Sequence, residues 1–354
     1  MKVLYAIQGT GNGHLSRAQE IVPIINKYVD TTVLVSGNQS QIQSCFDINY
    51  RKTGLTFLSG KTGKIDLLRT VFKSHPIDFF NEIRTFPIKQ FDLVLTDFEP
   101  VSAWSALMHG VPCIEMSHQA AVIHPNVPKA AGRNRIGEYI LNHYCPTKEK
   151  IGFHFERYDQ RIYTPVIRKN IRLIDVKFDG HYTVYLPAFH DEVLLQFLKQ
   201  FPVKWEVFSK FTKEKYQVDN TFFYPIDQDD FTRSFSHCEG VLCGAGFELP
   251  AEAMFLGKKL MVIPMKGQYE QQCNAEAAKR LGATMIDSLN LLHHRSINLW
   301  LSQGEYVHVD FRDETEEIVQ KVLTDFDRNY RPVERNSIGE KSTLEKLSVL
   351  KYLF

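Results

Sequence analysis

The chain has 354 residues, enough for two domains, and 44% of them are hydrophobic, which suits a globular protein with packed cores. Its formal net charge of +1 gives no sign of nucleic-acid binding. The longest apolar runs have the length of a strand, too short to cross a bilayer, and the N-terminal residues MKVLYAIQGTG fit a first strand rather than a signal peptide. We therefore expect a cytoplasmic protein without a transmembrane helix.

The six cysteines include no CxxC pair, so we expect neither a disulfide framework nor a structural metal site. The best candidates for a metal site are His237, Cys238 and Cys243, which are close together in the sequence. Because a second pair of ligands is missing, we interpret these cysteines as buried thiols and expect no bound metal.

The first half of the chain alternates strand and helix patterns, beginning with a βαβ unit that implies a parallel sheet and a right-handed crossover. The predicted elements are a strand over 2–7, a glycine turn over 9–13, a helix over 15–28, a strand over 32–35, a strand over 91–96, a helix over 103–109 and a strand over 112–116.

The alternation stops over residues 157–177, which are basic and irregular, and then starts again. The second half is predicted to contain strands over 182–186, 205–208, 221–224, 240–243, 260–263 and 284–286, and helices over 191–200, 249–256 and 269–281.

This order predicts two doubly wound, Rossmann-like α/β domains that face each other across a cleft. We expect the first domain over 1–163, a linker over 164–179, the second domain over 180–328 and a charged tail over 329–354. Leucines spaced by threes indicate a helix near the end of the tail, and packing of the tail on the first domain is left open. Since ligands bind beyond the carboxyl ends of strands in such sheets, the glycine turn of each domain should lie on the rim of the cleft.

The first glycine turn reads QGTGNGH and ends at His14. Its glycines allow the backbone to approach a ligand closely. A dinucleotide site would need a third glycine in place of His14 and an acid where Ser36 and Gly37 follow the next strand, so an NAD site is disfavoured. The GK[ST] ending of a P-loop is also missing. Taken alone, the turn fits an ordinary strand-to-helix connection equally well.

A histidine and an aspartate are predicted to meet at this rim. Asp97 ends the strand FDLVLTD, so its carboxylate should emerge at the same sheet edge as His14. A carboxylate bonded to an imidazole fixes its tautomer, and the other ring nitrogen can then take a proton from a hydroxyl. The alternative for Asp97 is a cap on the next helix. His118 and Gln119, after the strand PCIEMS, are candidates for substrate contact, and His118 is a rival base.

Residues 244–275 combine a second glycine turn, a short helix, a strand and a polar run that opens another helix. Gly244 and Gly246 leave the N–H groups of Gly246, Phe247 and Glu248 available for a diphosphate at the helix N-terminus. This combination predicts a nucleotide-sugar pocket.

Carboxylates and amides in the same segment suit hydroxyl groups. Glu252 is the first candidate for a ribose diol, and Glu248 is its rival. Either acid alone fits an ordinary early-helix residue that is stabilised by the helix dipole, but the glycine turn and the polar run occur together. The polar side chains that could hold a sugar are Gln268, Glu270, Gln271 and Asn274.

On these motifs the chain resembles inverting GT-B glycosyltransferases, including plant and bacterial UDP-glycosyltransferases and the enzyme that makes lipid II. It is similar to bacterial glycosyltransferases related to teichoic-acid synthesis. The resemblance covers nearly the whole chain, through GTGNGHLSRA, LVLTDFEP, GAGFELPAEAMFLGKKLMVIP and GQYEQQCNAEAAKRLGA. It implies a nucleotide-diphosphate sugar as co-substrate and no other cofactor.

The resemblance also implies roles for individual residues. His14 matches the base that activates the acceptor, and Asp97 matches its supporting aspartate. Glu270 stands where an aspartate is more usual, and the aromatic residue that stacks on uridine in the plant enzymes has no clear counterpart, so the donor base is left open. The resemblance further implies a diphosphate turn at Gly246 and its neighbours Gly244, Phe247 and Glu248, a ribose contact at Glu252, and donor-sugar contacts at Glu270, Gln271 and Asn274. The sequence pattern itself adds Gln268 on the donor side, and Gly11, Asn12, Gly13, His118 and Gln119 on the acceptor side of the cleft.

Gly244 also bears on the stereochemistry. Retaining enzymes of this fold carry a second glutamate at its position, so the glycine favours inversion. We expect metal-independent transfer to an acceptor hydroxyl in cell-surface polysaccharide or glycolipid synthesis. The alternatives are a sugar-nucleotide epimerase or hydrolase, and a non-catalytic nucleotide-sugar-binding protein. Epimerases of this scaffold usually carry an arginine after Gly-Thr, which this chain lacks.

The acceptor is the least defined part of this interpretation. Residues 67–91 mix apolar, aromatic and basic side chains. They suit a groove for the acceptor, or contact with a membrane that carries a lipid-linked acceptor. The simpler interpretation is that helices in this segment pack on the first sheet.

Overall fold

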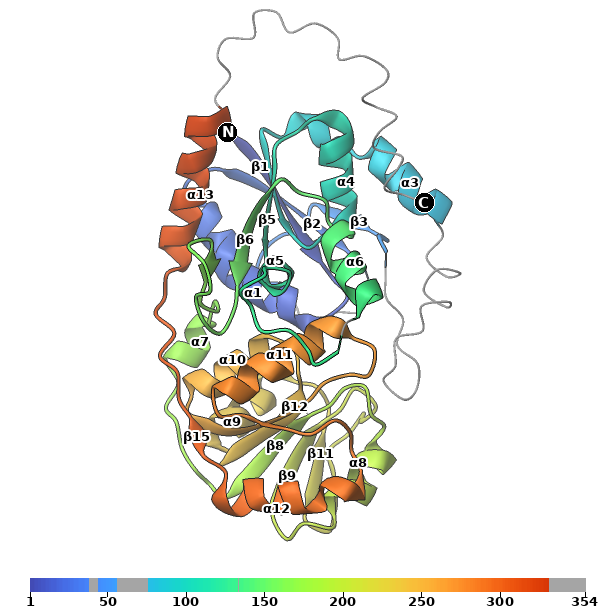
Figure 1. Ribbon diagram of the computed structural model, residues 1–354, viewed down its shortest axis with the longest axis vertical. Coiled ribbons are helices and arrows are strands. Elements are labelled where there is room, and N and C mark those ends of the chain that lie inside the picture. Colours follow the sequence, from blue (N-terminus) through green and yellow to red (C-terminus); the bar gives the residue numbers. More distant parts are fainter. Residues whose placement is uncertain (38–43, 56–75, 133, 331–354) are drawn as a thin grey trace, which may run out of the picture.

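The computed structural model describes residues 1–37, 44–55, 76–132 and 134–330, which form two α/β domains stacked one above the other (Figure 1). The first sheet has seven strands, all parallel, in the order β3-β2-β1-β4-β5-β6-β7. Its interior strand β1 is buried from Val3 to Gln8, as expected for a parallel strand that is covered on both faces. The strands are β1 (Lys2–Gln8), β2 (Asp30–Ser36), β3 (Tyr50–Lys52), β4 (Leu93–Asp97), β5 (Cys113–Ser117), β6 (Glu149–Phe153) and β7 (Ile162–Tyr163).

Helices α4, α5 and α6 of the first domain begin with side-chain caps. Glu99 accepts bonds from the N–H groups of Val101 and Ser102 at the start of α4, and Ser117 caps α5. The bounds are α1 (Asn12–Ile25), α3 (Pro76–Thr85), the 3₁₀ turn η1 (Ile88–Gln90), α4 (Pro100–His109), α5 (His118–Val122) and α6 (Arg135–His143).

The second sheet has the order β10-β11-β9-β8-β12-β13-β14, with β15 paired to β13. Only the β10–β11 and β13–β15 pairs are antiparallel. The strands are β8 (His181–Tyr185), β9 (Lys204–Phe208), β10 (Tyr216–Val218), β11 (Thr221–Tyr224), β12 (Gly240–Gly244), β13 (Lys258–Ile263), β14 (Thr284–Met285) and β15 (Tyr306–Val307). The helices are α8 (Asp191–Leu198), α9 (Gln228–His237), α10 (Glu248–Phe255), α11 (Tyr269–Arg280), η2 (Leu291–His293) and α12 (His294–Gln303).

Two helices join the domains. The short α7 (Lys169–Arg172) lies within the expected linker. The long α13 (Thr315–Tyr330) falls mostly within the range expected for the second domain, yet it packs on α1 of the first (Figure 1). Glu316 of α13 accepts bonds from Lys27 and Tyr28, which follow α1. The chain therefore returns to the first domain before the tail.

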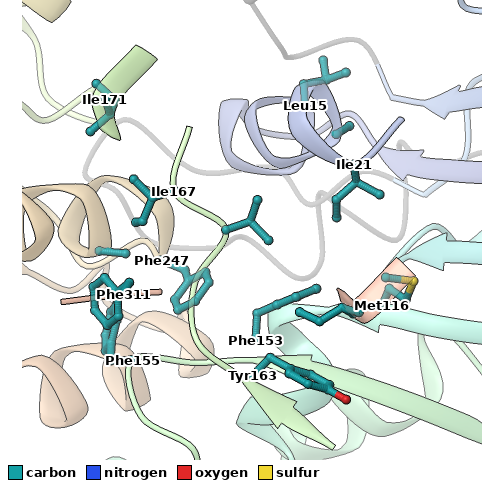
Figure 2. Packing of buried hydrophobic residues seen from close by; sticks show 14 of the residues in the cluster. Leu15, Ile21, Met116, Phe153, Phe155, Tyr163, Ile167, Ile171, Phe247 and Phe311 are labelled. Carbon is teal, nitrogen blue, oxygen red and sulfur yellow. The ribbon is translucent and has the colours of Figure 1, made fainter. Parts of the chain in front are cut away.

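Buried side chains continue from one domain into the other. Phe153 ends β6 of the first domain and Phe155 follows it, while Phe247 precedes α10 of the second. The ring centroids of Phe155 and Phe247 are 5.1 Å apart, and the close-up shows both in one cluster with Ile167 of the linker (Figure 2). The domain interface is thus part of the hydrophobic core.

The structure confirms the predicted fold class of two Rossmann-like α/β domains, while the bounds of several helices and strands differ from the prediction. Helix α1 begins at Asn12, earlier than expected, so His14 lies in its first turn. The sequence did not predict strand β6, because two of the residues in EKIGF are charged. One of them, Lys150, forms an ion pair with Glu115 on the neighbouring strand β5. The expected helix near the end of the tail lies outside the described residues.

Part of the expected acceptor segment is described. Within α3 and the turn after it, Phe79, Ile83, Phe86 and Ile88 are buried, which fits packing on the first domain. Residues 67–75 lie outside the described ranges. In the part of the chain that the structure describes, no helix combines the length and the apolar character needed to span a membrane.

Candidate active site

Each sheet has a point at which the order of its strands along the chain reverses, and these two points face each other. In the first sheet the chain order reverses between β1 and β4, and in the second it reverses between β8 and β12. Loops after these strands face the other domain, with α1 against α10 and α5 against α11. The predicted cleft therefore lies where ligands of open α/β sheets bind.

His14 and Asp97 meet as predicted. Nδ1 of His14 lies 2.9 Å from Oδ1 of Asp97, whose side chain is fully buried at the end of β4. Burial by itself raises the pKa of Asp97, whereas the neighbouring Arg17 and His14 lower it. Their combined effect is larger, so the pKa of Asp97 lies below its ordinary value and the group is a carboxylate. The next residue, Phe98, has a φ of 56°, a strained value for a residue with a side chain, and its ring stacks on Tyr144.

The other nitrogen of His14 faces Gln119 of α5 in the first domain, and Gln119 in turn reaches Glu270 of the second. Nε2 lies 3.5 Å from Nε2 of Gln119, which also donates to Oε2 of Glu270 at 3.1 Å. Since Nδ1 donates to Asp97, Nε2 keeps its lone pair and accepts. Oε1 of Gln119 is buried without a partner in the described part of the chain. These three residues form a polar pocket that can receive a hydroxyl.

Arg17 is a site residue that sequence reasoning missed. Its Nε lies 3.1 Å from Oδ2 of Asp97 and its Nη2 lies 2.5 Å from Oδ1, so it grips the carboxylate with two bonds. Its Nη1 donates to Oε1 of Glu248 in the second domain. The spacing held a signal, because Arg17 follows His14 by one helical turn and therefore shares its face of α1.

The second glycine turn is built from backbone. β12 ends at Gly244, and no side chain caps the start of α10. An added Cβ at Gly246 would meet no atom within 4 Å, so the space in front of this backbone is open. Phe247 is buried and stacks on His118 with the ring centroids 3.9 Å apart. The start of α10 can therefore offer N–H groups to an anion.

Glu248 opens α10 beside the dyad. Its Cγ lies 3.1 Å from the place of a Cβ at Gly13, so this glycine makes room for it. Burial raises the pKa of Glu248 to about 7, although Arg17 lowers it. The other charged or titratable groups that face it are Asp97, Glu252, His14, Tyr5 and Arg168.

Two predicted residues are placed differently from expectation. Both oxygens of Glu252 accept bonds from Arg168 of the linker at 2.6 Å, and the residue is 3% exposed, so its carboxylate joins linker to α10 rather than facing the cleft. His118 is 1% exposed, with Nδ1 against the carbonyl of Phe153 and Nε2 against Oδ1 of Asn274. It therefore has no nitrogen left to act as the base.

The remaining predicted residues lie around the same interface. Asn12 donates to the hydroxyl of Tyr185, across the cleft from Gly11. Asn274 donates to the carbonyl of Ala245, which ties α11 to the glycine turn. Gln268 and Gln271 are half-buried at the start of α11, where Oε1 of Gln271 accepts from the backbone of Met265.

The cysteine region holds no metal ligands in this fold. Cys238 and Cys243 are buried, and His237 contacts Asp179. Across the described ranges, no group of three His, Cys, Asp or Glu side chains is arranged to hold a metal ion.

Comparisons with known proteins show the family and the fold of the chain. The sequence model of a family described as glycosyl transferase family 1 matches residues 1–303. No curated protein matches the chain. Similar solved structures include UGT89C1 from Arabidopsis thaliana complexed with UDP, which is 14% identical with a TM-score of 0.54 and covers 100% of this chain and 99% of its own.

Two other solved structures are similar to a comparable degree. UGT2 from Phytolacca americana, complexed with UDP-2fluoro-glucose and pterostilbene, is 12% identical, with a TM-score of 0.53 over 99% of this chain and 98% of that one. MurG from Acinetobacter baumannii is 14% identical, with a TM-score of 0.50 over 91% of this chain and 99% of that one. At such identities the likeness concerns the fold, which is GT-B.

Proposed function

The chain belongs to glycosyl transferase family 1 and has the GT-B fold, and we propose that it transfers a sugar from a nucleotide-diphosphate sugar to an acceptor hydroxyl with inversion. The donor is held by the second domain and the acceptor by the first. A UDP donor is favoured because two similar structures hold UDP or a UDP sugar. The observation that carries the proposal is the His14–Asp97 pair, in which Nδ1 of His14 contacts the buried carboxylate and Nε2 lies beside Gln119.

In the proposed reaction, His14 takes the proton of the acceptor hydroxyl. The oxygen then attacks the anomeric carbon while the bond to the diphosphate breaks, which inverts that carbon in one displacement. Asp97 stabilises the imidazolium that forms, and Gln119 and Glu270 orient the hydroxyls of the reacting sugars.

The leaving diphosphate is stabilised by the start of α10. In this proposal the backbone N–H groups of Gly246, Phe247 and Glu248 face the place where negative charge develops, and the helix dipole adds to their effect. We propose that this backbone takes the part that a metal ion plays elsewhere, so transfer should persist in EDTA.

The acceptor is proposed to be a hydroxyl of a cell-surface polysaccharide or glycolipid precursor. Helix α3 exposes Ile77 by 75% and Phe80 by 36%, with Arg84 over the ring of Phe80. This surface suits peripheral contact with a membrane that carries a lipid-linked acceptor. Co-sedimentation with anionic vesicles tests it; unchanged binding after Ile77→Ser and Phe80→Ser would contradict a role for α3.

The experiment for the function is a screen of nucleotide sugars, with and without a bacterial lipid extract, that follows release of the nucleoside diphosphate. A transferase releases it only when an acceptor is added. Equal release from the donor alone indicates a hydrolase, and conversion of the donor sugar without release indicates an epimerase. Donor binding without turnover would leave a nucleotide-sugar-binding protein.

A further inference from the structure

We call His14 and Asp97 the dyad, and the segment from Gly244 to Glu248 at the start of α10 the donor turn. Arg17 is the one described side chain that bonds to both of them. Its residue is 2% exposed, and its guanidinium lies 5.5 Å above the ring of Phe153. Two of its N–H groups bind Asp97 on the first domain, and a third binds Glu248 on the second. A planar fork can hold such an arrangement, whereas a single ammonium group cannot.

The dyad depends on this fork for its orientation. Oδ1 of Asp97 accepts from both Nδ1 of His14 and Nη2 of Arg17, while Oδ2 is held by Nε of Arg17. With both oxygens fixed, the plane of the carboxylate is fixed, and so is the direction of the imidazole that it holds. Without the fork, the carboxylate could turn and carry His14 away from the acceptor.

The donor turn depends on the same side chain for its charge. Glu248 places a carboxylate at the N-terminus of α10, where the diphosphate is proposed to bind. Two anions at one helix end would repel each other unless a cation lies between them. Nη1 of Arg17 supplies that cation.

We propose that Arg17 is a positioning residue that couples donor binding on the second domain to the orientation of His14 on the first. The inference rests on the glycosyl transfer proposed above. A diphosphate that reaches α10 competes with Glu248 for Nη1 of Arg17, while the two bonds to Asp97 keep the base aimed at the acceptor.

The competing explanation is that Arg17 serves only the stability of the domain interface. Lys258 provides a matched control, because its buried Nζ donates to the carbonyls of Lys177, Ser236 and Cys238 at 2.7, 2.8 and 2.7 Å. Lys258 is the first residue of β13, at the end of the strand that lies away from the cleft. Loss of either buried cation should lower the melting temperature, and only loss of Arg17 should change catalysis.

The test compares Arg17→Met, Arg17→Lys, His14→Ala, the double variant His14→Ala with Arg17→Met, and Lys258→Met. Melting is followed by circular dichroism, and kcat and the donor KM are measured with the donor and acceptor that the screen identifies. We expect Arg17→Met to lower kcat about 100-fold and to raise the donor KM, since it removes the bonds to Asp97 as well as the bond to Glu248. Arg17→Lys should recover part of the donor KM but little of kcat.

The double variant separates positioning from stability. If Arg17 acts through His14, adding Arg17→Met to His14→Ala lowers kcat by no more than about threefold. The proposal would be overturned if the double variant lost kcat by the product of the two single-variant factors. It would also be overturned if the kcat of Arg17→Met matched that of Lys258→Met. Should Arg17→Met not fold, an unchanged kcat in Arg17→Lys would overturn it equally.

Failure of the function itself would look different. If the wild-type protein transfers no sugar, calorimetry with UDP still tests the donor arm. Binding at least about tenfold weaker in Arg17→Lys supports a link between Arg17 and the diphosphate site, and unchanged binding contradicts it.

Discussion

The two sheet edges that meet at the cleft are built in opposite ways. On the first edge, His14, Asp97 and Arg17 hold one another through side-chain bonds, and the aspartate is fully buried. On the second edge, the turn at Gly244 and Gly246 offers backbone without a side-chain cap. A network of fixed side chains suits proton transfer, whereas open backbone at a helix start suits an anionic ligand. The difference fits the proposal that the first domain carries the proton transfer and the second domain binds the donor.

Replacement of His14 by Ala should have the largest effect. We expect kcat to fall at least about 1,000-fold, because His14 is the group proposed to take the acceptor proton and is held for this by Asp97. Donor affinity by calorimetry should stay within about twofold, since the donor turn is untouched. Equal loss of donor binding would break the division between the two edges.

Replacement of Asp97 by Asn comes next. The amide can no longer stabilise an imidazolium, and it presents an N–H where Arg17 or His14 needs an acceptor. We expect kcat to fall about 100-fold or more, with little change in the donor KM. A circular dichroism melt should accompany the kinetics, and a kcat close to that of the wild type would remove Asp97 from the mechanism.

Replacement of Gly246 by Ala tests the other edge. The structure has room for the methyl group, so the fold should tolerate it, but the methyl occupies the space in front of the diphosphate turn. We expect the donor KM to rise roughly 10- to 100-fold with little change in kcat, which corresponds to one or two lost bonds to a charged group.

Gly11→Ala is the matched control for Gly246→Ala. Its Cβ would also meet nothing within 4 Å, and it lies at the start of α1 on the first edge. It should change the acceptor KM and leave the donor KM within about twofold. A similar effect of both variants on the donor KM would mean that the donor spans both edges.

Glu248 should make donor binding depend on pH. With a pKa of about 7, its carboxyl is mostly protonated at pH 6 and mostly ionised at pH 8. Because the ionised form repels a diphosphate, affinity should fall up to about tenfold between these values. UDP-glucose is the better probe than UDP, whose terminal phosphate titrates near pH 6. Glu248→Gln should flatten the profile, and an unchanged slope would refute the role of Glu248.

Most of this fold was accessible from sequence because the parallel strands are short apolar runs that end at glycines or polar residues. The His14–Asp97 contact followed from the rule that carboxyl ends of parallel strands share an edge. Contacts between the domains were not accessible. Arg168 could not be paired with Glu252, nor His118 with Asn274, because periodicity gives no relative orientation for two separate sheets.

The site residues that sequence reasoning misjudged lie at this interface. Arg17 was missed because a buried arginine on an amphipathic helix is rare, and its two carboxylate partners are distant in the chain. Helix α13 returns to α1 through Glu316, which local sequence gives no reason to expect.

The central claim is a single displacement driven by His14 on the first edge at a donor held by the second. The most direct test is the anomeric configuration of the sugar in the product, read from the proton coupling constant of its anomeric carbon by NMR. The account predicts the opposite configuration to that of the donor. Retention of the donor configuration would contradict it.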